Sequence, residues 1–193
     1  MALERNVAAS TQNQAFNALV FLYKRVIESP LENVKATRSR KEARIPVVLT
    51  REEVKQVLLL LDDVPELVVK LLYGCGLRIT EAVKQRVQNI DFGFKQVTVR
   101  DGKGMKDRVT PFPDNLESLL RNHLERVKMI HEKDLAQGYG SVYLPNALAR
   151  KYPKAEREWN WQYVFPGRGL SEDPLSGIIR RHHLDQSAIN RTI

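Results

Sequence analysis

Two glycine-flanked segments of the sequence carry side chains that suit chemistry on a phosphate ester. Residues 74–81 read Gly-Cys-Gly-Leu-Arg-Ile-Thr-Glu and place Arg78 just after a predicted helix end. Residues 102–108 read Gly-Lys-Gly-Met-Lys-Asp-Arg and place Lys103 in a tight turn between two predicted strands. Glycine lets a backbone approach its target closely, a guanidinium can bind two phosphate oxygens at once, and a lysine can donate a proton. Together the two segments indicate a site that acts on a phosphodiester.

Taken one at a time, Arg78 and Lys103 also fit a plainer interpretation, an arginine at a helix end and a solvent-exposed lysine in a turn. Their joint pattern is more specific. In-line attack on a phosphate builds negative charge on the non-bridging oxygens, and a fixed guanidinium such as that of Arg78 neutralises it. The leaving sugar oxygen needs a proton, which we expect Lys103 to deliver from the tip of a hairpin.

The charge balance favours a polyanionic partner. The 193 residues include 31 Lys and Arg against 23 Asp and Glu, a formal net charge of +8, and the isoelectric point is near 9.7. Such an excess is typical of nucleic-acid-binding proteins, although a merely basic protein without such a partner fits it too. Cys75 is the single cysteine, which excludes an internal disulfide and a cysteine-based metal cluster and suits a reducing cytoplasm. The apolar runs are too short to span a membrane.

The elements that must position these side chains begin with a helix and a basic linker. Residues 1–28 end in an amphipathic helix over 11–28, capped by Ser10 or Thr11, which we expect to be the last helix of a preceding domain. Residues 29–47 form a linker whose cations would follow a phosphate backbone, and a solvated hinge without a ligand is the alternative. The cations are Lys35, Arg38, Arg40, Lys41 and Arg44.

Residues 48–193 are expected to form a mixed α+β domain, mainly helical with a small antiparallel β-hairpin sheet. A capping box at residues 50–53 opens the first helix, and alternating residues on both sides of the Gly-Lys-Gly turn predict the strands. Helices are predicted over about 50–61, 63–74, a short stretch after Thr80, and 114–133, and strands over 96–100 and 108–112.

Residues from about 138 to 181 have no regular pattern and combine aromatic rings with cations. Rings interleaved with cations suit unpaired bases more than duplex DNA. A subdomain packed by its own aromatic residues is the alternative. The rings belong to Tyr139, Tyr143, Tyr152, Trp159, Trp161, Tyr163 and Phe165.

The sequence resembles the tyrosine recombinases, and among them the integron integrases. Residues 74–81 are similar to the first arginine box of that family, and residues 102–108 to its lysine hairpin. Residues 4–15, 45–53 and 159–166 are similar to integron integrase segments, as is the later run Arg180-Arg181-His182-His183. The resemblance covers nearly the whole chain and becomes poor after about Gln186.

The resemblance implies a DNA-binding enzyme that clamps its substrate with two domains and exchanges strands through a 3′-phosphotyrosyl intermediate, with no metal or high-energy cofactor. Arg78 matches the first catalytic arginine and Lys103 the catalytic lysine. The implied partners are duplex attachment sites, folded single-stranded cassette sites and further protomers in a tetrameric synapse. Bases flipped out of the folded sites are expected to stack in a pocket lined by Trp161, Pro174, His182 and His183.

The resemblance also implies the domain boundaries. Residues 1–28 would be the C-terminal helix of a SAM-like core-binding domain, 29–47 the linker, and 48–193 the N-terminal part of a tyrosine-recombinase catalytic domain. The aromatic segment at about 138–181 would be the insertion found in integron integrases.

Other parts of the family's site are not found where the resemblance would place them. The family uses a His-x-x-Arg box, a later His or Trp, and a nucleophilic tyrosine, all in C-terminal helices. His123-Leu124-Glu125-Arg126 has the right letters, but it falls in an amphipathic helix and is expected to be a surface helix pair. The six tyrosines all lie at or before residue 163, so none fits the nucleophile.

We therefore expect a recombinase chain that is cut at both ends and binds DNA without cleaving it. The rival interpretation is a non-catalytic basic nucleic-acid-binding module or a regulatory remnant that occupies recombination sites. Preference for bulged hairpins over duplex of equal length would favour the first, and equal, salt-sensitive binding to both would favour the second.

Overall fold

A computed structural model of the chain describes residues 7–31, 47–100, 102, 104, 106–145 and 148–193. The chain divides into two compact units, Met1–Val48 and Leu49–Ile193. None of the described helices combines the length and the apolar character needed to cross a membrane.

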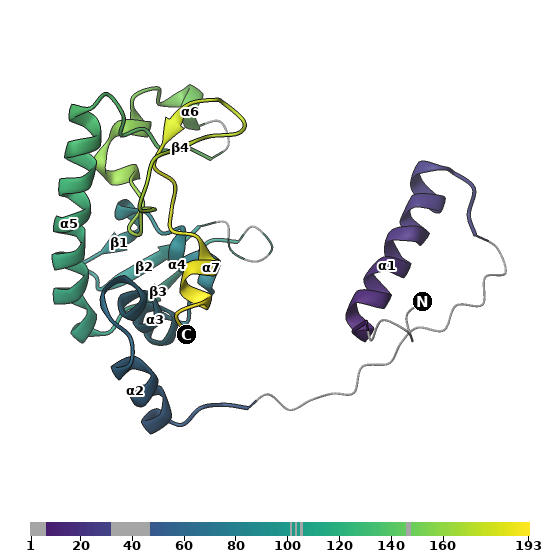
Figure 1. The fold of residues 1–193 in the computed structure, drawn as a ribbon, viewed down its shortest axis with the longest axis horizontal. Coiled ribbons are helices and arrows are strands. Elements are labelled where there is room, and N and C mark those ends of the chain that lie inside the picture. The colour runs from purple at the N-terminus through teal and green to yellow at the C-terminus, as the bar shows by residue number, and fades with distance from the viewer. Residues whose placement is uncertain (1–6, 32–46, 101, 103, 105, 146–147) are drawn as a thin grey trace. The chain divides into compact units, whose positions relative to one another are not determined.

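The first unit contains one long helical segment (Figure 1). Helix α1 (Ala9–Phe21) continues into a π-helical turn, η1 (Leu22–Val26). The helix begins at Ala9 with Ala8 as its N-cap and no side-chain cap, so the predicted cap by Ser10 or Thr11 is wrong: both residues lie within the first turn. No residue of α1 is buried.

Three helices lead through the second unit to the arginine box. Helix α2 (Arg51–Leu59) opens with the predicted capping box: Thr50 Oγ1 accepts from the Glu53 N–H at 3.2 Å, and Glu53 Oε2 accepts from the Thr50 N–H at 2.7 Å. Helix α3 (Asp63–Cys75) ends at Gly76, whose φ of 62° lies in the left-handed region that favours glycine. This reversal leads into the short helix α4 (Ile79–Val83), with Arg78 at its N-cap.

A three-stranded antiparallel sheet follows. After a 3₁₀ turn, η2 (Val87–Asn89), the strands β1 (Ile90–Asp91), β2 (Gln96–Val99) and β3 (Arg108–Pro111) pair in the order β1-β2-β3. Val97 lies opposite Thr110 and Val99 opposite Arg108. The predicted strands are thus confirmed, as is the fold class: a mainly helical domain with a small antiparallel sheet.

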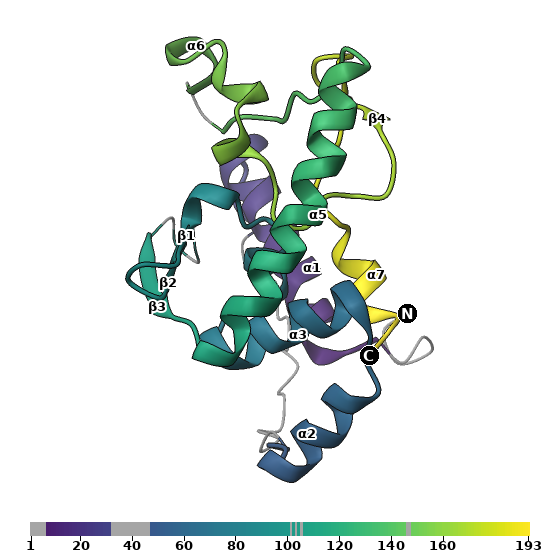
Figure 2. The same cartoon turned by 90° about the vertical axis from the view of Figure 1, so that its left-hand side faces the viewer.

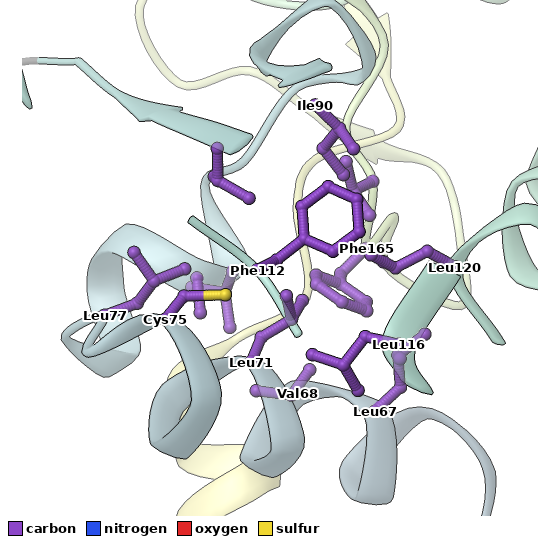
Figure 3. Packing of buried hydrophobic residues seen from close by; sticks show 14 of the residues in the cluster. Leu67, Val68, Leu71, Cys75, Leu77, Ile90, Phe112, Leu116, Leu120 and Phe165 are labelled. Carbon is purple, nitrogen blue, oxygen red and sulfur yellow. The ribbon is translucent and has the colours of Figure 1, made fainter. Parts of the chain in front are cut away.

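The main core lies between α3, the sheet and helix α5 (Glu117–Ala136), which follows the 3₁₀ turn η3 (Asp114–Leu116). Apolar side chains at helical spacing on α3 and α5 meet the inward-facing residues of β2, and Phe165 fills the centre (Figure 3). The most deeply buried members, each no more than 1% exposed, include Val68, Leu71, Val97, Leu120 and Phe165.

The segment predicted to be irregular contains several short elements: α6 (Leu148–Lys151), η4 (Ala155–Arg157), η5 (Trp159–Trp161), β4 (Ser171–Glu172) and β5 (Ile179–Arg180). Helix α7 (Gln186–Asn190) then ends the described chain. In both views α6 and β4 lie at the end of this unit opposite α2 (Figures 1 and 2).

The aromatic residues of this segment divide between packing and surface. Phe165 belongs to the main core, whereas Tyr163 packs with Val142, Leu144 and Ala155 in a second, smaller core. Tyr143 and Tyr152 remain 44% and 48% exposed. The interpretation of this segment as a subdomain packed by its own aromatic residues therefore holds for part of the rings only.

Candidate functional site

The carboxylate of Glu81 organises the arginine box. Its Oε2 accepts from the backbone N–H of Arg78 at 2.8 Å, and its Oε1 accepts from Arg78 Nη1 at 2.8 Å. Arg108 adds a two-pronged contact, with Nη1 donating to Oε1 at 2.9 Å and Nη2 to Oε2 at 2.6 Å. The side chain of Glu81 is only 8% exposed, whereas that of Arg78 is 55% exposed. The guanidinium of Arg78 is thus held in place and remains accessible.

The same contacts keep Glu81 charged. The hydrogen bonds from Arg108, reinforced by those from Arg78, lower the pKa of the Glu81 carboxyl from 4.5 to about 2 against the opposing effect of burial. The carboxylate is therefore ionised at neutral pH and binds both guanidinium groups as a permanent anion.

The glycine hairpin meets the arginine box through Arg108. Beyond its pairing with Glu81, Arg108 Nη2 lies 3.4 Å from the carbonyl oxygen of Gly76, and Thr110 Oγ1 donates to the carbonyl oxygen of Cys75 at 2.9 Å. Gly102 is buried beside this pair: a Cβ at Gly102 would lie 2.9 Å from the Lys106 carbonyl oxygen and 3.2 Å from Arg108 Nη1. The two glycine-flanked segments therefore meet at the Glu81–Arg108 pair.

Several predicted site residues lie outside the described residues. These are Lys103 and the linker cations Lys35, Arg38, Arg40, Lys41 and Arg44.

A cleft of about 890 Å³ opens between α4, the sheet and the aromatic segment. It brings together all four residues predicted to form a stacking pocket, namely Trp161, Pro174, His182 and His183. Tyr143, Tyr152 and Tyr163 add further rings to its lining. The ring of His183 meets that of Tyr163 edge to face, with centroids 5.3 Å apart. Glu81 lines the same cleft, so the cleft adjoins the arginine box.

Polar residues that sequence reasoning did not single out also line the cleft. Arg86, which is 8% exposed, lies under the rings of Trp161 and Tyr163, and burial lowers the pKa of its guanidinium. Arg100 donates from Nε to Asn89 Oδ1 at 3.1 Å. The position of Arg86, shortly after α4 and before an apolar residue, could have marked it as a candidate for burial. Its partners lie more than fifty positions away, so they could not be identified from the sequence.

Two further arginines fix the segment that carries His182 and His183. Arg181 donates two hydrogen bonds, of 2.6 and 2.8 Å, to the carboxylate of Asp134 and a third, of 2.9 Å, to the carbonyl oxygen of Gly167. Arg180 donates to the carbonyl oxygen of Val142 at 2.7 Å. The two adjacent histidines thus line the cleft from a well-anchored segment that follows β5.

The His123-Arg126 pair is not a phosphate-binding box. The Nε2–H of His123 donates to the carbonyl oxygen of Val164 at 2.7 Å, and its ring stacks on Phe165 at 5.1 Å. Arg126 pairs with Asp63 at 2.7 Å on the surface. The prediction of a surface helix pair is right for Arg126 but wrong for His123, which is 4% exposed. No group of three or more metal-ligating side chains occurs among the residues described here.

The geometry thus consists of a positioned arginine, a hairpin joined to it and an adjoining aromatic cleft. Sequence comparison assigns the chain to a family. A profile of the phage integrase family matches residues 47–193, and a profile of the phage integrase N-terminal SAM-like domain matches residues 1–33. The chain therefore belongs to the phage integrase family.

Individual relatives bear similar names. The chain is 42% identical over 192 residues to proteins called integrase/recombinase from Escherichia coli and Pseudomonas aeruginosa. The alignment covers 99% of this chain and 57% of each relative, so the chain spans little more than half their length. Tyrosine recombinase XerA of Thermococcus kodakarensis is 42% identical over 84 residues, 42% of this chain and 30% of the relative.

Solved structures give a more distant likeness. A crystal structure of XerA recombinase is 19% identical, covering 98% of this chain and 54% of that one with a TM-score of 0.47. A XerH site-specific recombinase bound to a palindromic difH substrate is 20% identical, covering 62% and 39% with a TM-score of 0.48.

Proposed function

We propose that this chain is part of a site-specific tyrosine recombinase of the integron integrase type, which integrates DNA cassettes by recognising folded single strands. The observation that carries the proposal is the cleft beside the arginine box. It gathers Trp161, Pro174, His182 and His183 from separate parts of the sequence into one surface. Its volume of about 890 Å³ is within the range of about 300–1,000 Å³ typical of small-ligand sites.

Arg78 is the proposed phosphate-binding residue. Glu81 holds one edge of the Arg78 guanidinium but shares its single negative charge with Arg108, and 55% of the Arg78 side chain stays exposed. Arg78 is therefore held in position while the two arginines together keep a net positive charge. A fixed guanidinium stabilises the charge that develops on a phosphate under attack. Lys103 is the proposed proton donor to the leaving oxygen, and the burial of its neighbour Gly102 against the Glu81–Arg108 pair supports this assignment.

The cleft is the proposed site for unpaired bases. Aromatic and imidazole rings offer stacking surfaces to any base, worth about 1–3 kcal/mol for each base stacked. Duplex DNA keeps its bases stacked on one another and cannot use such a cleft, whereas a bulged hairpin presents them. The half-buried Trp161 and the exposed Pro174 are the proposed stacking partners.

The remaining assignments follow the same proposal. Residues 1–28 and 48–193 are the proposed parts of the two DNA-clamping domains, and the linker cations Lys35, Arg38, Arg40, Lys41 and Arg44 the proposed phosphate contacts between them. The proposed partners are folded cassette sites, duplex attachment sites and further protomers in a tetrameric synapse.

We further propose that the 193-residue chain on its own binds DNA without cleaving it. All six tyrosines lie at or before residue 163, whereas the resemblance places the nucleophile in later, C-terminal helices. The last of the six, Tyr163, is 7% exposed and receives a hydrogen bond from Arg86, and burial raises the pKa of its hydroxyl. A neutral, buried hydroxyl is a poor nucleophile. A covalent protein–DNA adduct formed by this chain, detected on a denaturing gel with end-labelled substrate, would refute this statement.

The binding proposal is tested by gel shift with two labelled DNAs, a hairpin with one unpaired base and the same hairpin fully paired. We expect the wild-type chain to bind the bulged hairpin about tenfold or more tightly, the factor that 1.4 kcal/mol of stacking corresponds to. Trp161→Ala and His182→Ala should abolish this preference and leave binding to the paired hairpin nearly unchanged.

Tyr73→Ala is the matched control, because Tyr73 is an aromatic residue of α3 that is 58% exposed and does not line the cleft. Its bulge preference should equal that of the wild type. Equal binding of both DNAs by the wild type, with the same steep salt dependence, would instead identify a generic basic module.

A further inference from the structure

Arg86 connects the arginine box to the aromatic segment. It lies three residues after the end of α4, in an extended conformation that pairs it with Tyr163 through an isolated β-bridge. From there Nη1 donates to the carbonyl oxygen of Trp161 at 2.6 Å and Nη2 to that of Tyr143 at 2.7 Å. One guanidinium thus holds two points of the aromatic segment that are eighteen positions apart in the sequence.

The guanidinium also lies against the rings of the cleft. Its central carbon is 4.5 Å from the ring centroid of Tyr163 and 5.9 Å from that of Trp161, and Nη2 lies 3.3 Å from the Tyr163 hydroxyl. A cation over a ring is attracted by the negative face of its π system. These contacts fix both the backbone and the ring orientation on one wall of the cleft.

The charge of Arg86 has an unusual environment. The buried Arg180 lies beside Glu156 and Asp173, and Arg181 pairs with Asp134. In the described part of the chain, by contrast, Arg86 contacts neutral oxygens and rings. Burying a cation without a carboxylate carries a desolvation cost, which the hydrogen bonds to the two carbonyl oxygens have to offset.

We propose that Arg86 is the positioning residue for base recognition: it sets the aromatic wall of the cleft so that Trp161 can stack on an unpaired base. This inference rests on the proposed function and adds to it a buried residue that supports the aromatic wall of the cleft. A planar guanidinium reaches the two carbonyl oxygens from two nitrogens in a fixed fork, whereas a lysine offers a single nitrogen at one point. Arg86→Lys keeps the charge and loses the fork.

The test compares Arg86→Lys with Arg157→Lys. Arg157 is the control, because its Nη2 also lies near a backbone carbonyl oxygen of the aromatic segment, 3.4 Å from that of Gly138, but it is exposed and does not line the cleft. Binding to the bulged and the paired hairpin is measured for each variant, together with the urea midpoint of unfolding. We expect Arg86→Lys to reduce the bulge preference about tenfold, equivalent to the loss of 1.4 kcal/mol of stacking, and Arg157→Lys to preserve it.

A spectroscopic readout separates positioning from stability. The chain has two tryptophans, so a Trp159→Phe background leaves Trp161 as the single indole. Titration with the bulged hairpin should quench Trp161 fluorescence in this background, and adding Arg86→Lys should shift the midpoint about tenfold upward. If Arg86→Lys does not fold, Tyr163→Phe, which removes only the hydroxyl that Arg86 contacts, should raise the same midpoint by a smaller, measurable factor.

The outcomes are distinct. If the wild type shows no bulge preference and Trp161→Ala changes nothing, the proposed function fails and this inference fails with it. If Trp161→Ala removes the preference but Arg86→Lys keeps it, the function stands and the role of Arg86 is refuted. If Arg86→Lys and Arg157→Lys lose the preference in equal proportion to their loss of stability, Arg86 is a structural residue only. If Tyr163→Phe has to stand in and leaves the quenching midpoint unchanged, the positioning role is also refuted.

Discussion

Replacing Glu81 by glutamine removes the anion that organises the arginine box. The carboxylate accepts four hydrogen bonds, two from Arg78 and two from Arg108. An amide has one oxygen, so either orientation turns its NH₂ group toward donors that it cannot satisfy. Glu81→Gln therefore loses the ionic attraction and also brings the amide NH₂ group close to N–H groups of the arginines, which repel it.

The size of the loss follows from the pKa and from exposure. A pKa of about 2 in place of 4.5 corresponds to about 3 kcal/mol in favour of the charged carboxylate in the folded chain. The side chains of Arg78 and Arg108 are 55% and 36% exposed, and solvent screens part of this interaction. We expect Glu81→Gln to lower the free energy of unfolding by about 2 kcal/mol at neutral pH.

The assay is urea unfolding followed by circular dichroism over a pH series. Because the native pKa is depressed, the contribution of Glu81 is complete above pH 4.5 and is lost as the pH falls toward 2. The gap between wild type and variant should be widest at neutral pH and close over this window. Glu53→Gln is the control, since Glu53 has the same capping-box position on the exposed helix α2 and should cost less.

Equal stability of Glu81→Gln and wild type at pH 7 would contradict the proposed organisation of the box. A gap of constant size down to pH 2 would contradict the ionic origin of the effect, and would indicate that packing alone is disturbed.

Three further predictions concern the core of the second unit. Burial lowers the pKa of His123, so the unfolded chain binds a proton at this residue before the folded chain does as the pH falls below about 6.5. The folded state therefore loses stability over that range. His123→Gln should flatten the pH dependence of the urea midpoint between pH 7 and 5.5. A Cβ at Gly74 would lie 2.9 Å from Pro113 Cγ, so Gly74→Ala should cost about 1–3 kcal/mol in urea unfolding, whereas Gly169→Ala, with open space around it, should cost little. Burial raises the pKa of the Cys75 thiol to about 11, so alkylation by iodoacetamide at pH 8 should be slow in the native protein and fast in urea; rapid native alkylation would show that the end of α3 is open.

Features set by neighbouring residues could be predicted from the sequence. The Thr50–Glu53 capping box, a helix end within the Gly74-Cys75-Gly76 segment and the strands around the glycine turn each depend on a few adjacent residues; the helix itself runs one residue beyond the predicted end at Gly74. The cap of α1 was the exception: Ser10 and Thr11 are good capping residues, yet the helix starts at Ala9, one position before the nearer of them.

Interactions between distant residues could not be predicted in the same way. Glu81 and Arg108 are 27 positions apart, and Arg86 and Trp161 are 75 apart. Amino-acid type also misled the prediction for His123. It lies between Leu120 and Leu124 on the buried face of α5, and that spacing signals a core position. A histidine there suggests a surface, but the ring is buried, with Nε2 bonded to the carbonyl oxygen of Val164 and Nδ1 without a partner among the described residues.

The five-residue helix α4 explains how the box and the cleft are kept in register. At its N-terminal end Glu81 ties it, through Arg108, to the base of the hairpin, and just beyond its C-terminal end Arg86 ties the chain to the aromatic segment. Ala82 and Val83 between them are at most 1% exposed. Since a close-packed interior does not yield to small displacements, the helix cannot slide, and its two ends are fixed relative to each other. A displacement of the aromatic wall would therefore require the contacts of Arg86 to change. We accordingly expect Arg86→Lys to alter the position of this wall.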